Sequence, residues 1–582
     1  MIRNGFIAAE SNPPLASGAK KLNIGVRVNV IMHLRIPSVL LVLLCIPLIT
    51  AAQSSAVFLN PGYSRPPSQP KPLSIPQTTQ TTVSNPSPWN FPNINITSFL
   101  ARDENEPSIA INPSDPNNFI IGANDYRSDS SLFCFVTIDG GLHWRSYPMQ
   151  KNNTYAASAF NPAVAFNSNG KAFYTFGRAQ LSHLGNPYAI NDVACFTNAN
   201  KGDSASWTLP VRIHFDSLNS LSAKTFADKF YTAVDRGQNS PYIGRVYTAW
   251  VEYVIGEKNH ILISRSLDEG KTWSTPLSIT DTANYQCPIP AIGPNGELYV
   301  SFLDLDTNHL NIHCTKSLDG GTTFSPSANK IISPYKNLGS IDSSGAYAHP
   351  VLKGHVRASS FPSIAVDRSP LHSGRIYVTW AGKGNDNRHH IYLSSSDDKA
   401  QTWSTPKTIE NDPNPAATDK FLPWIAVDNT NGDIGVLYYD SRNDQTNNIL
   451  TDAYLSFSHD GASTFTPLRI SSASFDPRAN SSLDSTFIGD YLGLDAENKH
   501  WYPVWSDTRV GYDQDLYIGI VRPYAPSAPK EFVVIEDPAT HFAMLRWKHD
   551  AIPTIGEPLG KYSFKFWRVD QVIDQTLLSS ER

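Results

Sequence analysis

One short pattern recurs five times along the chain and restricts its fold more than any other feature. Each copy reads Ser or Thr, any residue, Asp, a short stretch that usually contains Gly, and then Trp or Phe. The aromatic residue follows the Asp by five positions in every copy. Repetition at a fixed internal spacing indicates an architecture of similar units. The copies are Asp139 with Trp144, Asp268 with Trp273, Asp319 with Phe324, Asp398 with Trp403 and Asp460 with Phe465.

The chemistry of this repeat is that of a tight turn between two strands. An Asp carboxylate accepts hydrogen bonds from backbone N–H groups of its own turn, and Gly supplies a positive φ. The aromatic ring then packs back into the core. We therefore interpret the five Asp residues as structural. Their spacing predicts a unit of roughly 50 to 60 residues, with one further unit hidden between Asp139 and Asp268, and this size fits the blades of a β-propeller.

Seven apolar segments, one in each unit, read as first strands. Aromatic residues make up 11% of the chain against only 4 Met, which favours strands over helical bundles. We predict an all-β protein, a β-propeller with seven blades, six being the alternative. The last unit lacks the Asp turn, so residues 95–101 are expected to complete its sheet and close the ring. The seven segments are 106–112, 161–166, 229–235, 287–293, 361–367, 422–428 and 490–495.

The N-terminal part predicts export. After Met32 come a basic residue, an apolar run over 39–49 and two small residues at 51–52, the layout of a secretory signal peptide. The run is short for a membrane span, although a signal-anchor is the alternative. Residues 53–94 are rich in Pro, Ser, Thr and Gln and read as an extended linker. We expect a secreted, periplasmic or cell-surface protein with no stable membrane span after cleavage.

The predicted domain organisation follows from these boundaries. Residues 1–52 form an N-terminal extension and signal peptide, 53–94 the linker and 95–522 the propeller. In residues 523–582 the pattern changes, and a Pro-rich lead with Trp547 and Tyr562 resembles the opening strands of a fibronectin type III module. A full sandwich of this kind needs about 100 residues, so we predict a small, partial β-sandwich-like accessory segment.

Cysteine usage indicates buried thiols. Cleavage near residue 52 leaves Cys134, Cys195, Cys287 and Cys314, each inside an apolar run or at the start of one. Free buried Cys behaves as a small hydrophobic residue. We therefore predict four free cysteines without a disulfide.

Charge and motifs exclude several functional classes. The chain has 47 basic and 52 acidic residues, a net charge of −5, and no long basic run, so no nucleic-acid partner is expected. A phosphate-binding Gly-rich loop, the HExxH zinc signature and the GxSxG elbow are absent from the sequence. No cofactor is expected. Oxygen-rich segments at 304–309 and 440–448 leave Ca²⁺ as an alternative, although they lack the spacing of a defined calcium loop.

The five Asp turns resemble the Asp-boxes of the sialidase (neuraminidase) superfamily, whose members are β-propeller glycoside hydrolases and related binding proteins. The resemblance covers about residues 100–522. It implies an exo-α-sialidase-like glycosidase acting on terminal acidic sugars of extracellular glycans or glycoproteins. Family sialidases have six blades and an Arg-Ile-Pro motif near the first blade, whereas residues 105–109 contain no Arg. The alternative is a non-catalytic propeller that binds glycan or protein at the cell surface.

Strand parity predicts which face carries the chemistry. In four-stranded antiparallel blades, loops after the second strand and connections into the first strand share one face, opposite the Asp turns. The residues at the entries to the first strands should lie there nearest the axis: Glu106, Asp228, Lys229, Asp419, Lys420, Asp490 and Tyr491.

The resemblance assigns roles on that face. Arginines grip the substrate carboxylate, a Tyr assisted by a Glu is the nucleophile, and an Asp is the general acid/base. A structural alternative remains for the two Asp-x-Arg pairs, in which Asp caps its loop and Arg bridges neighbouring blades. The catalytic candidates are Arg127, Arg442, Arg509, Asp490, Tyr491, Glu106 and Asp125, and the substrate-binding candidates are Arg178, Tyr439, Asp440 and Asp507.

Overall fold

The computed structural model describes eighteen segments of the chain. They are residues 93–97, 103–125, 131–149, 157–180, 190–216, 225–254, 258–280, 284–305, 310–325, 328–342, 349–413, 418–479, 487–510, 513–523, 530–536, 543–548, 564–570 and 574–580. The predicted signal peptide and most of the predicted linker lie outside these residues. Among the described residues, no helix has the length and apolar character that a membrane crossing requires.

Seven four-stranded antiparallel sheets dominate the structure, and each is one blade. Blade 1 contains β2 (Glu104–Ile111), β3 (Phe119–Asp125), β4 (Ser131–Thr137) and β5 (Arg145–Pro148). Blade 2 contains β6 (Ala157–Phe166), β7 (Ala172–Gln180), β8 (Ile190–Asn198) and β9 (Val211–Asp216), with a short 3-10 helix η2 (Ser204–Ser206) before β9. Blade 3 contains β10 (Thr225–Val234), β11 (Val246–Val254), β12 (His260–Ser266) and β13 (Leu277–Ser278).

The remaining blades follow the same order. Blade 4 contains β14 (Tyr285–Ile292), β15 (Leu298–Asp304), β16 (Asn311–Ser317) and β17 (Lys330–Pro334). A two-stranded sheet of β18 (Ser340–Asp342) and β19 (His349–Val351), then η4 (Lys353–His355), leads to blade 5. Blade 5 contains β20 (Ser363–Val366), β21 (Ile376–Lys383), β22 (His389–Ser396) and β23 (Lys407–Thr408). Blade 6 contains β24 (Lys420–Asp428), β25 (Asp433–Asp440), β26 (Asp452–Ser458) and β27 (Thr466–Arg469).

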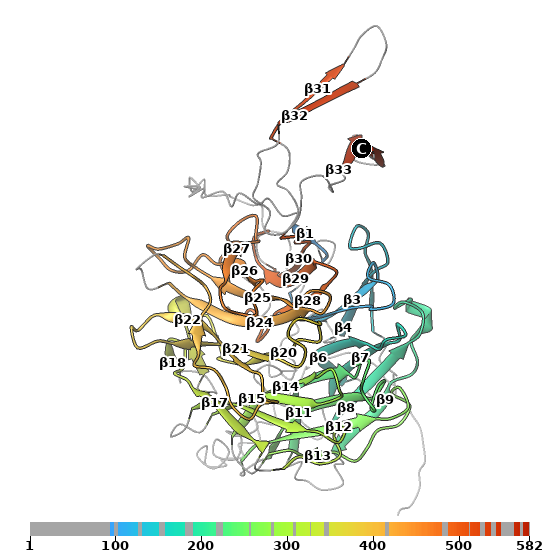
Figure 1. Ribbon diagram of the computed structural model, residues 1–582, viewed down its shortest axis with the longest axis vertical. Coiled ribbons are helices and arrows are strands. Elements are labelled where there is room, and N and C mark those ends of the chain that lie inside the picture. The colour runs from blue at the N-terminus through green and yellow to red at the C-terminus, as the bar shows by residue number, and fades with distance from the viewer. Residues whose placement is uncertain are drawn as a thin grey trace, which may run out of the picture. The chain divides into compact units, whose positions relative to one another are not determined.

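Blade 7 contains β28 (Gly493–Glu497), β29 (His500–Asp507), β30 (Asp515–Gly519) and, from the other end of the propeller sequence, β1 (Asn93–Asn95). Each first strand packs against the first strand of the next blade, and β28 packs against β2. The blades therefore form a closed ring of seven, which confirms the all-β propeller prediction and excludes the six-blade alternative (Figure 1).

The ring closes through β1, which pairs antiparallel with β30. The prediction placed this strand at 95–101, whereas the structure places it at Asn93–Asn95, with one more backbone bond from Ile96 N to Leu516 O at 3.0 Å. The regular pairing ends where the Asn95 side-chain oxygen accepts a hydrogen bond from Thr97 N at 2.9 Å, which bends the chain. The Thr97 hydroxyl still contacts β30, where it accepts from Leu516 N at 2.9 Å. Residues 98–102 lie outside the described residues. Figure 1 shows β1 beside β30.

The five Asp turns connect the third and fourth strands of blades 1, 3, 4, 5 and 6. In blade 4, Asp319 Oδ1 accepts from the Ser317 hydroxyl at 2.6 Å and from the backbone N–H groups of Thr322 and Thr323, both at 3.0 Å. The Gly321 N–H in turn donates to the Ser317 hydroxyl at 2.9 Å. The carboxylates thus organise their own turns, as the structural interpretation predicted.

Blade 2 carries a variant of this turn that the repeat pattern does not reveal. The side-chain oxygen of Asn198 accepts from Asn200 N at 2.7 Å and from Gly202 N at 3.2 Å. An amide oxygen here replaces the hydroxyl and carboxylate acceptors of the other blades. The hidden unit predicted between Asp139 and Asp268 is therefore present.

Neighbouring blades are fastened at these turns by long basic side chains. Lys171 of blade 2 donates to the backbone oxygen of Glu269 in blade 3 at 3.0 Å. Arg245 of blade 3 donates to Gly320 O in blade 4 at 2.9 Å, and Arg375 of blade 5 donates to Gly461 O in blade 6 at 3.1 Å. These three Asp turns therefore also form contacts between neighbouring blades.

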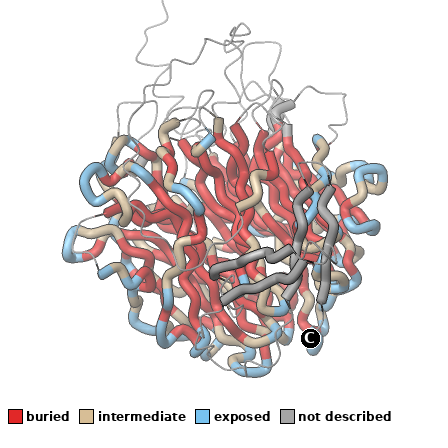
Figure 2. The backbone as a smooth tube through the Cα atoms, turned by 90° about the horizontal axis from the view of Figure 1, so that it is seen from above, coloured by how far each residue is buried: buried red, intermediate tan, exposed pale blue. Residues whose placement is uncertain are grey.

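The core lies between the sheets. Figure 2 shows buried backbone along the strands of the blades and exposed backbone mainly in the connecting loops. Trp250, Trp380 and Trp505 on second strands are at most 1% exposed and fill the space between blades. The four cysteines of the described residues are buried free thiols, which confirms that prediction.

The C-terminal segment forms two hairpins. Strand β31 (Lys530–Glu536) pairs with β32 (Ala543–Lys548), and β33 (Phe564–Asp570) pairs with β34 (Asp574–Ser580), all antiparallel. The likeness to a fibronectin type III module stays a prediction.

Candidate functional site

Five first strands begin with a β-bulge that contains a non-glycine residue in the left-handed region. The ladders of β2, β6, β10, β14 and β24 each shift register there. Bulges re-aim side chains and are enriched next to active sites, and residues held at positive φ carry strain. The residues concerned are Glu106 (φ 54°), Asn161 (φ 51°), Lys229 (φ 54°), Cys287 (φ 53°) and Leu422 (φ 51°).

Two of these bulges help to form a group of charged side chains that we name the axial charge cluster: Glu106, Asp228, Lys229, Arg357 and Asp490. Lys229 Nζ lies 2.6 Å from Asp490 Oδ2 and 3.6 Å from Glu106 Oε1. Arg357 Nη2 lies 2.6 Å from the same Asp490 oxygen. Blades 1, 3 and 7 and the connection into blade 5 supply these residues, so the contacts span the ring axis.

Neutral partners complete the cluster. Glu106 Oε2 accepts a hydrogen bond from the Asn124 side chain at 2.8 Å, and Glu106 Oε1 accepts from Asp490 N at 3.2 Å. Asp228 Oδ1 accepts from Lys229 N at 2.8 Å and from the Asn161 side chain. The three carboxylates and Lys229 are at most 2% exposed. The cluster is therefore a buried, mutually supported network.

The environments of Glu106 and Asp490 move their pKa values in opposite directions. Burial, opposed in part by the charge of Lys229, raises the pKa of Glu106 to about 7. Burial alone would also raise the pKa of Asp490, but the charges of Arg357 and Lys229 outweigh it and lower that pKa. Near neutral pH, Glu106 holds a proton for much of the time and Asp490 is ionised.

An aromatic group adjoins the cluster. The rings of Tyr231, Trp424 and Tyr491 have centroids 5.2 to 6.0 Å apart, and Lys229 Nζ lies 6.0 Å from the Tyr491 ring centroid. Burial raises the pKa of Tyr491 well above its ordinary value. Its hydroxyl has no hydrogen-bond partner among the described atoms, so the predicted pairing with Glu106 is absent in this state.

Arg442 is held inside its own loop. Its Nε and Nη2 atoms donate to Asp440 Oδ2 at 2.8 and 2.5 Å, and Asp440 Oδ1 accepts from Arg442 N at 2.8 Å. Arg442 Nη2 also donates to Glu410 O, at the end of blade 5, at 3.0 Å. Its guanidinium lies over the Tyr454 ring at 4.4 Å.

Arg509 repeats this arrangement one blade further on. Its Nε and Nη2 atoms donate to Asp507 Oδ2 at 2.9 and 2.5 Å. Arg509 Nη1 donates to the Ser472 hydroxyl, which follows blade 6, at 2.7 Å and to the Asn93 side chain at 3.0 Å. Both Asp-x-Arg pairs thus have the geometry of the structural alternative, with Asp capping the loop and Arg bridging blades.

The other predicted residues are placed separately. Arg178 pairs with Asp192 through two bonds of 2.7 and 2.5 Å. The buried Tyr439 hydroxyl donates to Ser506 O at 2.6 Å. Asp125 is fully buried at the end of β3, and Arg127 lies outside the described residues. The structure therefore brings together Glu106, Asp490 and Tyr491, whereas the described arginines Arg178, Arg442 and Arg509 are each held by a separate Asp.

Sequence reasoning placed Asn124, Asp228 and Lys229 on this face without a role and missed Arg357 and Asn161. A proline partly marks the positions of the bulges in the sequence, because Pro107 and Pro162 directly follow the bulged residues Glu106 and Asn161. Arg357 has no such signal, since it precedes blade 5 in an irregular segment. In the described part of the chain, no three His, Cys, Asp or Glu side chains are grouped so as to hold a metal.

Comparison with known proteins gives fold-level likeness only. No protein family and no curated protein matches the sequence. Solved structures with likeness include a protein of unknown function from Dyadobacter fermentans (13% identity, 60% of this chain and 93% of that one, TM-score 0.39). A Hadza microbial sialidase shows 14% identity over 71% and 75% of the two chains, with a TM-score of 0.38.

A further structure is an α-L-arabinanase from Penicillium chrysogenum, solved with arabinobiose. It shows 11% identity over 63% of this chain and 97% of that one, with a TM-score of 0.40. Structural likeness at 11 to 14% sequence identity defines neither a reaction nor a substrate for this chain.

Proposed function

We propose that this chain is an exported, glycan-acting propeller whose axial charge cluster performs glycosidase-type acid–base chemistry. One observation carries the proposal: Glu106 and Asp490 share a cluster, yet their pKa values are shifted apart. In glycosidases, a raised pKa keeps one carboxyl group protonated as the proton donor, while the other carboxyl group stays ionised. The secretory layout of the N-terminal sequence and the resemblance of the Asp turns to Asp-boxes also support it.

In this proposal Glu106 is the proton donor. Its raised pKa keeps a proton available near neutral pH, and the Asn124 side chain, bonded at 2.8 Å, fixes the carboxyl group. The proton passes to the oxygen of the leaving sugar as the glycosidic bond breaks. Asp490 stabilises the positive charge that develops on the remaining sugar ring, and Lys229 and Arg357 keep it ionised. A water molecule then bonds to the charged ring carbon, and the proton that this water loses returns to Glu106. Because both carboxylates are buried, catalysis also requires the cluster to open to a sugar.

The finer assignment to sialidase chemistry is part of the proposal. Arg442 and Arg509 are bound by their own Asp partners, so they do not supply a guanidinium triad in this arrangement. Arg357, bonded to Asp490, is the guanidinium that lies in the cluster and could meet a substrate carboxylate. A sialoside is therefore the first substrate to test, beside neutral glycosides.

The test is hydrolysis by the exported full chain of a panel of fluorogenic glycosides that includes a sialoside. Glu106→Gln should lower kcat by about 10²- to 10⁴-fold, the usual contribution of a general acid. Asp397→Asn, an exposed carboxylate in the connection that carries an Asp turn, is the matched control and should keep wild-type activity. Hydrolysis that survives Glu106→Gln unchanged would contradict the assignment.

A second candidate function, a non-catalytic propeller that binds glycan or protein, is favoured by the same burial. Glu106 and Asp490 are at most 2% exposed and are bonded to other members of the cluster, as in an internal plug. Under this candidate no glycoside of the panel is hydrolysed, while a glycan array or a partner screen gives binding. Glu106→Gln would then change stability and leave that binding intact.

A further inference from the structure

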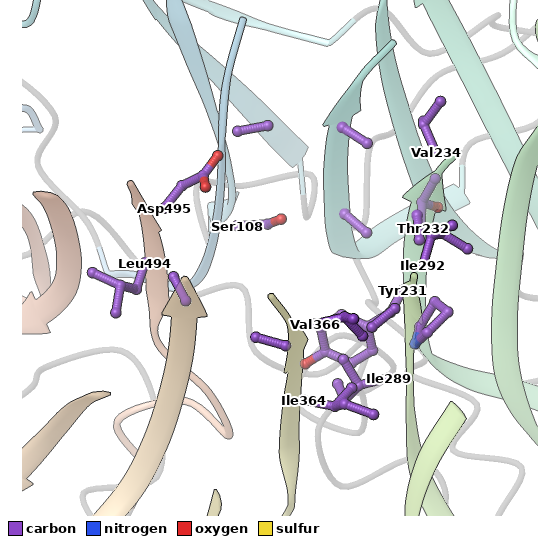
Figure 3. Close-up of a pocket in the computed structure, with 18 of the residues that line it drawn as sticks. Ser108, Tyr231, Thr232, Val234, Ile289, Ile292, Ile364, Val366, Leu494 and Asp495 are labelled. Atoms are coloured by element: carbon purple, nitrogen blue, oxygen red, sulfur yellow. The ribbon is translucent and has the colours of Figure 1, made fainter. Parts of the chain in front are cut away.

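A channel runs along the ring axis beyond the aromatic group. Its volume is about 220 Å³, and residues from all seven first strands line it. Figure 3 shows Ser108, Tyr231, Ile364 and Leu494 from separate strands around this space. Small side chains such as Ala165 leave it open. Tyr231 and Trp424, which line it, also belong to the aromatic group beside the axial charge cluster.

Charged side chains stand where the first strands end. Arg236 follows β10 in blade 3 and Arg368 follows β20 in blade 5, while Asp495 lies on β28 in blade 7. In a ring of seven, blades 3 and 5 flank blade 4, and blade 7 lies across the axis from them. The end of the channel therefore has a basic side and an acidic side, and we name it the channel mouth. It lies on the Asp-turn face, opposite the proposed catalytic cluster.

The two arginines of the channel mouth are less well paired than Arg442 and Arg509, which are each held by an Asp. Arg236 has no hydrogen bond or ion pair within the described part of the chain, although it is half-buried. The Arg368 guanidinium has a single long hydrogen bond, 3.5 Å to the Asn429 side chain. Burial and the like charge of Arg236 lower the pKa of Arg368 to about 9. The nearby carboxylates of Asp495, Glu497 and Asp235 offset part of the repulsion. An anion between the two guanidinium groups would offset more of it.

The acidic side offers acceptors. Asp495 Oδ2 accepts from Ile111 N at 2.8 Å and Asp495 Oδ1 from Ala496 N at 2.9 Å, which leaves further lone pairs on both oxygens. Glu497 follows on the same strand. A ligand with an anionic group towards the arginines and hydroxyl groups towards the carboxylates would satisfy both sides.

We propose that the channel mouth binds one carboxylate-bearing sugar residue, with its carboxylate on Arg236 and Arg368 and its hydroxyl groups donating to Asp495. The mouth opens into the channel of about 220 Å³, so the sugar ring has space between the ends of the first strands. The proposal does not depend on the hydrolase proposal, because the two sites share no charged residue.

The experiment is calorimetric titration of the full chain with D-galacturonate and N-acetylneuraminate as probes, and with D-galactose and sulfate as comparisons. Both sugar acids should bind, and Arg236→Gln and Arg368→Gln should each weaken binding at least tenfold. Arg145→Gln, which removes an exposed arginine from blade 1, is the matched control and should bind as wild type. Unchanged melting temperatures will show that the variants are folded.

Three results would overturn the proposal. One is the absence of sugar-acid binding by the wild type, and another is equal binding by the Arg236→Gln, Arg368→Gln and Arg145→Gln variants. The third is sulfate binding with no preference for the sugar acids, which would reduce the channel mouth to a simple anion site. Glu106→Gln should bind both sugar acids normally, so failure of the hydrolase proposal is distinguishable from failure of this one.

The pH dependence gives an independent check. Burial and the charge of Asp495 raise the pKa of Glu497 to about 7, with Asp428 adding to the rise and Arg236 and Arg368 opposing it. Lowering the pH from 8 to 6 neutralises Glu497 and removes its repulsion of an anionic ligand. Binding should therefore tighten over that range in the wild type, and Glu497→Gln should remove the change. A wild-type affinity that is constant with pH would contradict the placement of the ligand beside Glu497.

Discussion

Lys229 and Asp490 are 261 positions apart in the sequence, yet their side chains form a 2.6 Å ion pair at the ring axis. Lys229 belongs to blade 3 and Asp490 precedes the first strand of blade 7, so the pair links blades that are not neighbours. Its partners Glu106 and Arg357 extend the link to blades 1 and 5.

Lys229→Met should strongly destabilise the propeller, because it leaves buried acidic groups short of a counter-charge. Breaking one partner of a buried pair costs about 3 to 5 kcal/mol. Lys201→Met is a matched control, since Lys201 and Asp115 also pair at 2.6 Å but Lys201 is 54% exposed. The control should cost about 1 kcal/mol or less. Denaturant unfolding of both variants measures the difference, and equal losses would contradict the buried-pair account.

The stability of the propeller should depend on pH through Glu106. Its folded pKa of about 7 is above the ordinary value of 4.5, so its protonated form stabilises the fold. That contribution is fully present below pH 4.5 and is lost as the pH rises through about 7. Between pH 5 and 8 the wild type should lose about 2.5 kcal/mol of unfolding free energy relative to Glu106→Gln. Parallel pH profiles of the two proteins would show that Glu106 is not the group responsible.

Arg442→Ala should lower the melting temperature and leave ligand binding unchanged, because Arg442 neutralises the buried Asp440 and bridges to blade 5. The expected loss is about 3 to 5 kcal/mol. The double variant Asp440→Ala/Arg442→Ala should lose less than the two single variants together, since it removes both charges. If Arg442→Ala instead abolishes binding of an acidic sugar at a normal melting temperature, Arg442 belongs to a binding site and its structural role is contradicted.

Asp319→Ala should cost about 1 to 3 kcal/mol of stability, because the backbone donors of Thr322 and Thr323 lose their acceptor. Asp319→Asn keeps one acceptor oxygen and should lose less. Differential scanning calorimetry ranks the three proteins. Ligand binding lost from Asp319→Ala without loss of stability would contradict the structural role of the Asp turns.

Removal of β1 should open the ring. A protein that begins at residue 98 lacks the pairing of Asn93, Ile94 and Asn95 with β30 and exposes an outer strand edge. It should unfold at lower denaturant concentration and self-associate, while one that begins at residue 91 should behave as the longer chain does. Denaturant titration and sedimentation compare the two. Equal stability and mass would show that β1 is dispensable.

The sequence predicted the propeller because its turns are local. The donors to Asp319 all lie within four positions of it, so a repeated short pattern in the sequence reveals the turn. The fourth strand of blade 7 could also be anticipated, although the residues that form it, Asn93–Asn95, could not.

The candidate site was harder to predict from the sequence, because its residues are far apart in the chain and the role of each charged residue could be interpreted in more than one way. In the sequence, an Asp-x-Arg motif fits a ligand-binding arginine and a loop-capping Asp equally well. The short distances from the Arg442 guanidinium to Asp440 Oδ2 favour the loop cap. Arg357 and Arg236 are important through their positions in the ring, which no local pattern records.

The pairing of β1 with β30 also sets a schedule for folding during synthesis. Asn95 and its partner Asp515 are 420 positions apart, and a ribosome adds about 5 to 20 residues per second. About 20 to 80 seconds therefore pass between the emergence of β1 and that of the strand it must join. Throughout that interval β1 lacks its partner strand and the ring cannot close, so the incomplete propeller presents unpaired strand edges while the rest of the chain is being made.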